Sequence, residues 1–309
     1  MNQFRTEAER IAPLTKREKE TALGIDPLFR SVENSVYFDN YNLPCPILVT
    51  ITTKKGENAH VVVRRTRHGD VNQEVAAFRA LKEFGLPVPD VLVSPFQNEQ
   101  GEDVAIYSVL AGENLQKLSM RSESGLQQAK ELLIQAVTKL SETTTFMEKH
   151  EMGKEIPRLT PLVEFEAARK QDSPWSKEDM FQTAVKKLQP VLEKIDAPLV
   201  FSNGDYQPGN FLASNGVITG FLDFESPVFQ DPLMGFVKYP IYDLFPLART
   251  NIVETFLERT GFSKKDFASR LALGCLKILQ EEISVSGGDG EEKIYRSRVL
   301  NLLNESISL

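Results

Sequence analysis

Strand-like and helix-like patterns lie in different parts of this 309-residue chain. Runs rich in β-branched and aromatic residues fill much of the first third, whereas most of the remainder has the apolar spacing of amphipathic helices. A separation of this kind is typical of an α+β protein, in which sheet and helices form distinct parts. We therefore predict a small antiparallel-sheet lobe followed by a larger, mainly helical lobe.

The sheet lobe is predicted to span residues 1–112, with residues 1–30 as a charged N-terminal extension. One helix, 71–84, has Asp70 as its capping residue and ends at Gly85. The polar segment 54–58 forms a turn between two strands, which favours an antiparallel sheet. Five strands are predicted in this lobe, at 36–38, 47–52, 59–64, 91–93 and 103–110.

The helical lobe is predicted to span residues 113–309, after a hinge at 108–113. One β-rich island, residues 199–223, interrupts the helices. Amphipathic spacing predicts helices at 126–140, 181–195, 250–260, 264–284 and 291–304.

Composition and charge exclude several classes of function. The net charge is −7 and the longest basic cluster is Arg64-Arg65-Thr66-Arg67, so no nucleic-acid partner is expected. No apolar run approaches the roughly 18 residues of a membrane span, so we expect no membrane partner and a cytoplasmic protein. Two cysteines and three histidines are too few for a disulfide framework or a zinc site. Any metal should be a hard cation bound by oxygen atoms.

The β-rich island contains two acidic loops, each after an apolar segment. Asp205 is followed by four residues and then by Asn210, and Asp223 begins the tripeptide Asp-Phe-Glu. This order and spacing match the catalytic loop and the metal-binding Asp of kinases. Phosphoryl transfer needs oxygen ligands for a magnesium–nucleotide complex, and one carboxylate that meets the substrate hydroxyl. The alternative is that these loops are hairpin turns, with Asp205 in solvent at a tip.

The sequence Asn-Gly-Asp-Tyr-Gln-Pro-Gly-Asn-Phe-Leu, followed by Phe-Leu-Asp-Phe-Glu, resembles the aminoglycoside phosphotransferase and choline kinase family. The resemblance implies a protein-kinase-like fold and phosphorylation of a small molecule. It implies that Asp205 receives the proton of the substrate hydroxyl, while Asn210 and Asp223 hold the metal. Members of this family usually carry His where this chain has Asn203, a position that mainly supports the loop.

Arg64 and Glu74 are predicted to contact the nucleotide together. The run Val61-Val62-Val63-Arg64-Arg65 resembles the kinase strand that carries a cation for the α- and β-phosphates. Strand alternation places the two arginines on opposite faces, and the resemblance favours Arg64. Glu74 lies on the apolar stripe of its helix, so it needs a partner, and Arg64 is the expected one. The alternatives are two exposed arginines and a Glu that reaches solvent.

Two other nucleotide contacts follow only from the resemblance. Backbone groups of Ser108, Val109 and Leu110 would hydrogen-bond adenine at the hinge. No glycine occurs between Gly24 and Gly56, so the glycine-free segment 39–46 would have to cover the phosphates.

The acceptor is expected to be a small molecule with a hydroxyl group. Acidic residues outnumber basic ones between residues 199 and 245, which suits a cationic or neutral polyhydroxylated acceptor. Structural roles are nevertheless favoured for Asp231, as a turn that braces the catalytic loop, and for Asp243, as a helix cap. The nearby aromatic residues are interpreted as core, although a cage for choline is an alternative; they are Phe229, Phe236, Tyr239, Tyr242 and Phe245.

Together these features predict an enzyme, an ATP- and Mg-dependent phosphotransferase that acts on a hydroxyl of an aminoglycoside, amino alcohol or sugar. The alternative is a nucleotide-binding pseudokinase with a regulatory role, motivated by Asn203 and the missing glycines. Protein kinase activity is disfavoured because no Ala-Pro-Glu motif follows Asp223.

Overall fold

The computed structural model describes residues 10–38, 46–66, 70–170, 173–285 and 290–308. The chain forms two compact units. The first, here called the sheet unit, comprises Met1–Glu113, Lys149–Lys154 and Phe211–Pro227. The second, the helical unit, comprises Asn114–Glu148, Glu155–Asn210 and Val228–Leu309.

The sheet unit gains two segments that the sequence analysis assigned to the helical lobe. The larger of them, Phe211–Pro227, is bound to the sheet unit by backbone contacts. The Phe221 amide donates to the Pro87 carbonyl at 3.0 Å, and the Thr219 hydroxyl donates to the Ala111 carbonyl at 2.7 Å. These contacts could not be predicted from the sequence, because their partners are far apart along the chain.

The sheet unit is built on a five-stranded antiparallel sheet with the order β1-β2-β3-β5-β4. All five predicted strands are present, and the first is longer than predicted. Their bounds are β1 (Phe29–Tyr37), β2 (Ile47–Thr53), β3 (Asn58–Arg65), β4 (Val91–Gln97) and β5 (Asp103–Ser108). The unit also contains the hairpin of β9 (Phe211–Ser214) and β10 (Val217–Phe221) and the 3-10 helix η2 (Glu151–Lys154).

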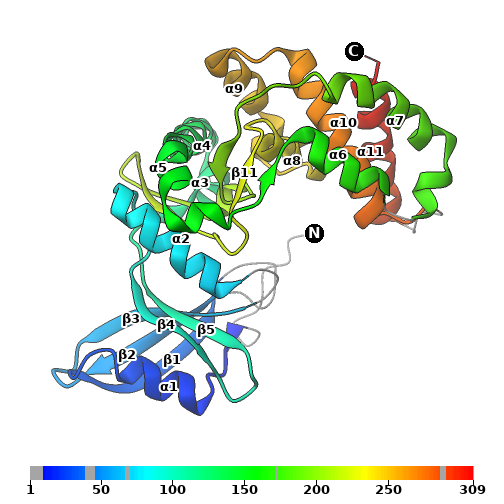
Figure 1. The fold of residues 1–309 in the computed structure, drawn as a ribbon. Coiled ribbons are helices and arrows are strands. Elements are labelled where there is room, and N and C mark those ends of the chain that lie inside the picture. Colours follow the sequence, from blue (N-terminus) through cyan, green and yellow to red (C-terminus); the bar gives the residue numbers. More distant parts are fainter. Residues whose placement is uncertain (1–9, 39–45, 67–69, 171–172, 286–289, 309) are drawn as a thin grey trace. The chain divides into compact units, whose positions relative to one another are not determined.

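Two helices lie on opposite faces of this sheet, α1 (Lys16–Leu23) and α2 (Val71–Phe84) (Figure 1). The predicted caps of α2 are confirmed, because the Asp70 side chain accepts from the Asn72 amide and Gly85 has a left-handed φ of 100°. Apolar residues of β2 and β3 alternate in burial. On the α1 side they pack with Val104 and Ile106 of β5 and with Ala12, Leu14 and Ala22.

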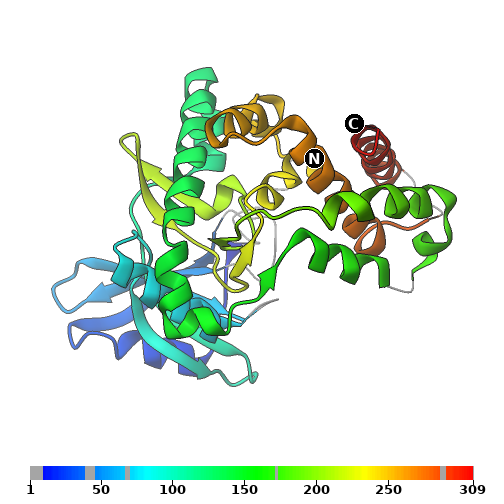
Figure 2. The same ribbon diagram turned by 45° about the horizontal axis from the view of Figure 1, so that its top comes forward.

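The helical unit has a core centred on α10 (Lys264–Glu281), which packs on α6 (Pro161–Lys170), α7 (Asp179–Leu192) and α11 (Glu291–Ser306) (Figures 1 and 2). Its other helices are α3 (Leu115–Arg121), which follows the two-residue strand β6 (Glu113–Asn114), α4 (Glu123–Glu142), α5 (Thr144–Lys149), α8 (Lys238–Tyr242) and α9 (Ile252–Thr260). Short 3-10 helices are η3 (Pro174–Lys177), η4 (Pro208–Asn210), η5 (Met234–Phe236) and η6 (Leu247–Arg249).

A three-stranded sheet in the helical unit carries the loop that contains Asp205. Its order is β7-β11-β8, with β7 at Arg158–Leu159, β8 at Val200–Ser202 and β11 at Val228–Gln230. β8 pairs with β11 in antiparallel register, so the loop after Ser202 starts from a paired strand. No helix among the described residues is long and apolar enough to cross a membrane.

Candidate active site

Arg64 is the centre of a cluster of charges on the α2 face of the sheet unit. Its Nε lies 3.0 Å from Oε2 of Glu74, and its Nη2 lies 2.7 Å from Oδ1 of Asp223 and 3.0 Å from Oε2 of Glu225. The Arg64–Glu74 pair predicted from the sequence is therefore present. We call these four residues the Arg64 cluster.

Negative charge exceeds positive charge in the Arg64 cluster, since three carboxylates share one guanidinium. Burial raises the pKa of Glu74 to about 7; Arg64 opposes this shift, whereas Asp223 and Glu225 add to it. Burial also disfavours the charged form of Arg64, but the three carboxylates hold its pKa above the usual value. The Tyr107 hydroxyl donates to Oε2 of Glu74 at 3.0 Å, so the buried carboxylate has two partners.

The turn that carries Asp223 is anchored by the residue that follows it. Phe224 is fully buried, and its ring packs edge-on against Phe78 of α2 at a centroid distance of 5.8 Å. Asp223 itself has a φ of 65°, which non-glycine residues adopt rarely. The Glu225 carbonyl accepts from the Asp70 amide at 3.1 Å, where α2 begins. Burial of the aromatic ring thus fixes the two acidic side chains on either side of it toward Arg64.

Arg65 points to the opposite face of the sheet, as alternation along a strand requires. It pairs with Glu18 of α1 at 2.7 Å and lies 3.6 Å from Glu102. Arg64 is therefore the arginine that faces Glu74 and Asp223, as predicted.

The predicted hinge residues form the end of β5 and the segment after it. Ser108 is already bound, because its amide donates to the Asp90 carbonyl at 2.9 Å and its hydroxyl accepts from the Asp90 amide at 2.8 Å. Val109 is exposed. Leu110 packs on Gly220 of the β9–β10 hairpin, where an added Cβ would lie 2.9 Å from the Leu110 Cδ1 atom. The loop predicted to cover the phosphates, 39–46, lies outside the described residues except for Pro46.

Asp205 lies in a loop of the helical unit that side chains hold from within. The Asp205 amide donates to Oδ1 of Asn203 at 3.2 Å, so the residue that replaces the family's His supports the loop. The carboxylate accepts from the side chain of Gln207 at 2.9 Å and lies 3.2 Å from the ammonium of Lys238. Its side chain is 22% exposed, so Asp205 is not a solvated residue at a turn tip. Asn210 donates to the Asp205 carbonyl at 3.1 Å.

Further packing holds the Asp205 loop in place. Tyr206 is fully buried, and its carbonyl accepts from the Tyr239 hydroxyl at 2.8 Å. Gly235 lies against the Tyr206 ring, where an added Cβ would approach a ring carbon to 2.0 Å. Only glycine fits at this position, which the sequence alone did not reveal.

The residues expected to have structural roles do so. Asp231 and Arg270 form a buried ion pair at 2.7 Å, and the Asp231 carboxylate also accepts from the Leu233 amide at 2.9 Å. Asp243 occupies the C-cap of α8 and pairs with Arg249. Among the aromatic residues, those buried in the core are Phe229, Phe236 and Tyr239, whereas Phe245 is exposed.

A cavity of about 280 Å³ lies beside the Asp205 loop within the helical unit. Gly204, the residue before Asp205, lines this cavity. Lys238, whose ammonium contacts the Asp205 carboxylate, lines it as well. Glu164 of α6 and Lys277 of α10 also line it and form an ion pair. The second oxygen of Glu164, Oε2, is buried and has no hydrogen-bond partner among the described residues.

The two predicted metal ligands flank one hairpin. Asn210 directly precedes β9, Asp223 follows β10 by two residues, and the hairpin register pairs Phe211 with Phe221. The described residues contain no cluster of three or more acidic, His or Cys side chains suited to a metal. Mg²⁺ usually takes one or two protein carboxylates and completes its shell with phosphate oxygens and water, so the carboxylate of Asp223 suits it. The excess negative charge of the Arg64 cluster also favours a cation.

Several residues of these two regions were not among the predicted site residues: Glu225, Tyr107, Gln207, Lys238 and Glu164. The tripeptide Asp-Phe-Glu was a signal for Glu225, since its two acids flank one buried aromatic residue. Gln207 lies two residues after Asp205 in the same motif. Tyr107, Lys238 and Glu164 carry no local sequence signal, because their roles depend on contacts between distant segments.

The family model for the phosphotransferase enzyme family matches residues 48–270. Among solved structures, a thermostable mutant of aminoglycoside phosphotransferase APH(4)-Ia, in ternary complex with ADP and hygromycin B, is similar with a TM-score of 0.63 at 13% identity, covering 94% of this chain and 97% of that chain. Amicoumacin kinase hAmiN, in complex with AMP-PNP and Ca²⁺, has a TM-score of 0.57 at 14% identity, with 93% of each chain covered. Choline kinase LicA from Streptococcus pneumoniae has a TM-score of 0.56 at 17% identity, covering 94% of this chain and 98% of that chain.

No curated protein sequence matches the chain. The α+β fold predicted from the sequence is confirmed, and the solved structures identify it as protein-kinase-like. The family model covers well over half of the sequence. This chain therefore belongs to the phosphotransferase enzyme family.

Proposed function

We propose that this enzyme transfers the γ-phosphoryl group of ATP, bound as its magnesium complex, to a hydroxyl group of a small molecule. The observation that carries the proposal is the pair of acidic regions. Asp205 is a partly exposed carboxylate beside a cavity, and Asp223 belongs to a cluster with excess negative charge around Arg64. Phosphoryl transfer needs one carboxylate for the hydroxyl and a second for the metal.

Asp205 is assigned to the acceptor hydroxyl. Its carboxylate oxygens accept from Gln207 and Lys238, and these two contacts orient it. A carboxylate held in this way accepts the proton of the hydroxyl as the hydroxyl oxygen bonds to the γ-phosphorus and the bond from that phosphorus to the oxygen of the leaving ADP breaks. The proton then resides on Asp205.

Arg64 and Glu74 are assigned to the nucleotide phosphates, with Arg64 as the cation and Glu74 as the residue that orients it. Asn210 and Asp223 are assigned to Mg²⁺, which compensates the charge of the phosphates when it is bound. Val109 and Leu110 supply backbone groups for adenine. Ser108 contributes less than expected, because its amide is occupied by Asp90.

The cavity beside Gly204 is assigned to the acceptor. Its carboxylates at Glu164, Glu281 and Glu282 and its ammonium groups at Lys238 and Lys277 suit a polar acceptor with several hydrogen-bonding groups. A volume of about 280 Å³ favours an amino alcohol or a single sugar ring over a larger molecule.

The test is ADP release with MgATP and a panel of amino alcohols, sugars and aminoglycosides, followed by detection of the phosphorylated product. Asp205→Ala should lower kcat by about 10²–10⁴-fold, because it removes the group that accepts the proton. It should leave binding of MgATP nearly unchanged. Glu258→Ala, which removes an exposed carboxylate on α9 of the same helical unit, is the matched control and should retain turnover.

Two outcomes would contradict the proposal. Unchanged turnover in Asp205→Ala would exclude this residue from the reaction. Magnesium-dependent ATP binding without any phosphorylated product across the panel would favour a pseudokinase.

A further inference from the structure

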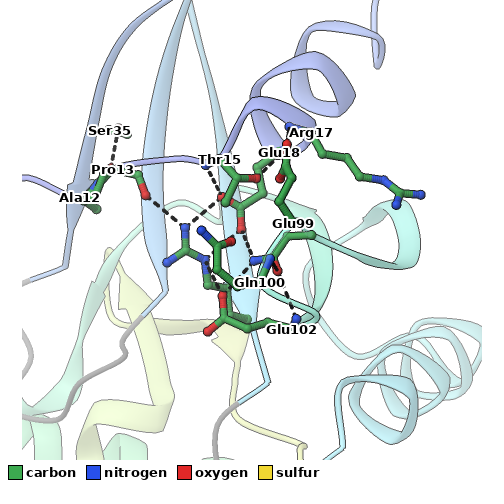
Figure 3. Close-up of polar contacts among 11 residues, drawn as sticks. Ala12, Pro13, Thr15, Arg17, Glu18, Ser35, Glu99, Gln100 and Glu102 are labelled. Atoms are coloured by element: carbon green, nitrogen blue, oxygen red, sulfur yellow. Dashed lines mark hydrogen bonds and ion pairs between the residues drawn. The ribbon is translucent and has the colours of Figure 1, made fainter.

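Arg65, the neighbour of Arg64, is held in a second set of buried charges on the α1 face of the sheet. Its Nε and Nη2 atoms donate to Oε1 and Oε2 of Glu18 at 2.7 and 2.8 Å. Nη2 also donates to the carbonyl of Pro13 at 3.0 Å. Figure 3 shows Glu18 and Pro13 among the polar contacts of this region. Arg65 therefore ties the end of β3 to the N-terminal extension.

Glu18 is fully buried, and every acceptor position of its carboxylate is used. Besides the two bonds from Arg65, Oε2 accepts from the Thr15 amide at 2.8 Å and Oε1 accepts from the Asn98 side chain at 3.1 Å. Burial raises the pKa of Glu18, but the hydrogen bonds from Arg65, Thr15 and Asn98 outweigh it and lower the pKa. The carboxylate is thus a fully satisfied anchor for Arg65.

The same contacts join α1 to the turn between β4 and β5. The Asn98 side chain donates to Glu102 at 2.7 Å and accepts from the amides of Gln100 and Glu102, both at 3.0 Å. At the start of α1, the Arg17 amide donates to Glu99 at 2.8 Å. Glu99, Gln100 and Glu102 lie around Glu18 in Figure 3. We call Glu18, Arg65, Asn98 and Glu102 the Arg65 cluster.

Arg64 and Arg65 are the last two residues of β3, where pairing with the neighbouring strand ends. A slip of one residue would exchange the faces of all side chains in the strand. Such a slip would leave an arginine at only one of the two clusters and place Val63 or Thr66 among the carboxylates of the other, so the two arginines together specify the register at this end. The bidentate contact of Glu18 with Arg65 also defines the orientation of one guanidinium, which anchors the end of the strand.

We propose that Glu18 is a positioning residue for phosphoryl transfer, which fixes Arg65 at the end of β3 and thereby holds Arg64 in place for the nucleotide phosphates. The inference rests on the proposed contact between Arg64 and the nucleotide. It assigns a function to the N-terminal extension, which precedes the region matched by the family model.

A double-mutant cycle on nucleotide affinity tests this role. The dissociation constant of Mg–AMP-PNP is measured for the wild type, Glu18→Gln, Arg64→Gln and the combination, and the acceptor KM is measured for the first two. Glu18→Gln should weaken nucleotide binding by about 10-fold and leave the acceptor KM unchanged. In the Arg64→Gln background, the same change should have little further effect, because Glu18 acts through Arg64.

Glu99→Gln is the matched control, since it alters a contact between the extension and the same turn but leaves Arg65 bound. It should bind Mg–AMP-PNP like the wild type. Losses that simply add in the double variant, or an equal loss in Glu99→Gln, would show a general structural effect and overturn the inference. Wild-type protein that binds no Mg–AMP-PNP would instead refute the proposed function itself.

A second variant covers the case in which Glu18→Gln does not fold. Glu18→Leu combined with Arg65→Met replaces the buried pair by apolar side chains, which often preserves stability. This variant should fold, keep its acceptor KM and still lose about 10-fold in nucleotide affinity, since Arg65 no longer anchors the end of β3 to the extension. Wild-type affinity in this folded variant would overturn the inference.

Discussion

Near the end of β3, each face of the sheet carries an Arg–Glu pair, and the pKa of the glutamate differs between the two faces. On each face an arginine binds a glutamate that is almost completely buried, Arg64 with Glu74 and Arg65 with Glu18. Hydrogen bonds lower the pKa of Glu18 despite its burial, whereas burial raises the pKa of Glu74 to about 7. Glu18 has N–H donors at every acceptor position, while Glu74 shares its arginine with Asp223 and Glu225.

This difference separates a structural cluster from one suited to a ligand. In the Arg65 cluster, N–H groups of the protein fill every acceptor position of the buried Glu18 carboxylate, so this carboxylate needs no ligand. The Arg64 cluster keeps an excess of negative charge that a bound cation would compensate. A buried group with a perturbed pKa next to an uncompensated charge is the pattern expected of a functional site.

The largest expected effect is on folding stability. Arg65→Gln leaves Glu18 buried without its main partner, which should lower the free energy of unfolding by about 3–5 kcal/mol. Arg64→Gln should cost clearly less, because Glu74 already binds a proton readily and still accepts from Tyr107. Urea unfolding at neutral pH measures both variants. Equal losses would remove the distinction between the two faces.

For nucleotide affinity the order of the two arginines should be reversed, with the larger loss caused by replacing Arg64. Arg64→Gln removes a charged donor to the phosphates and should weaken Mg–AMP-PNP binding by about 10–100-fold. Arg65→Lys keeps a cation near Glu18 and should reduce affinity less than Arg64→Gln does. Isothermal titration calorimetry provides the two dissociation constants. A larger loss in Arg65→Lys would place the nucleotide on the wrong face of β3.

Site residues could be predicted from the sequence where they lie in one short segment. They could not be predicted where their role depends on contacts between distant segments. Asp205 and Asn210 lie in one loop that binds its own backbone, so their spacing alone was a signal. Glu74 was identified because a charged residue on an apolar helical stripe must have a partner. The role of Glu225 and the whole Arg65 cluster depend on residues far apart along the chain, and the charged pattern of α1 resembles that of any exposed helix.

The pH dependence of stability should differ in sign between the two glutamates. The pKa of Glu74 is about 7 in the folded state and 4.5 as its ordinary value, so its contribution to stability should decrease as pH rises from 4.5 to 7. The pKa of Glu18 is lowered, so its contribution should be complete above pH 4.5 and be lost as pH falls further. In the wild type this decrease in the free energy of unfolding should be on the order of 1–2 kcal/mol between pH 4.5 and 7, and Glu74→Gln should remove it. Unfolding free energies measured from pH 3 to 8 test both signs. A Glu74→Gln profile parallel to that of the wild type would contradict the assignment.

The smallest effects concern the outer carboxylate of each cluster, and here the two faces should respond in opposite directions. Glu102 lies 3.6 Å from Arg65 and accepts from Asn98, so Glu102→Gln removes an attraction to Arg65 and a charged acceptor for Asn98 and should destabilise slightly. Glu225 binds the same Arg64 nitrogen as Asp223, so Glu225→Gln removes repulsion from a cluster with excess negative charge. Glu225→Gln should leave the stability of the ligand-free protein unchanged or slightly raise it. Each of the two variants should change the free energy of unfolding by less than about 1 kcal/mol. Chemical unfolding of the two variants side by side measures the sign. Glu225→Gln should also weaken Mg–AMP-PNP binding, because less negative charge remains to attract the cation. A carboxylate with a purely structural role would not combine unchanged or higher stability with lower nucleotide affinity.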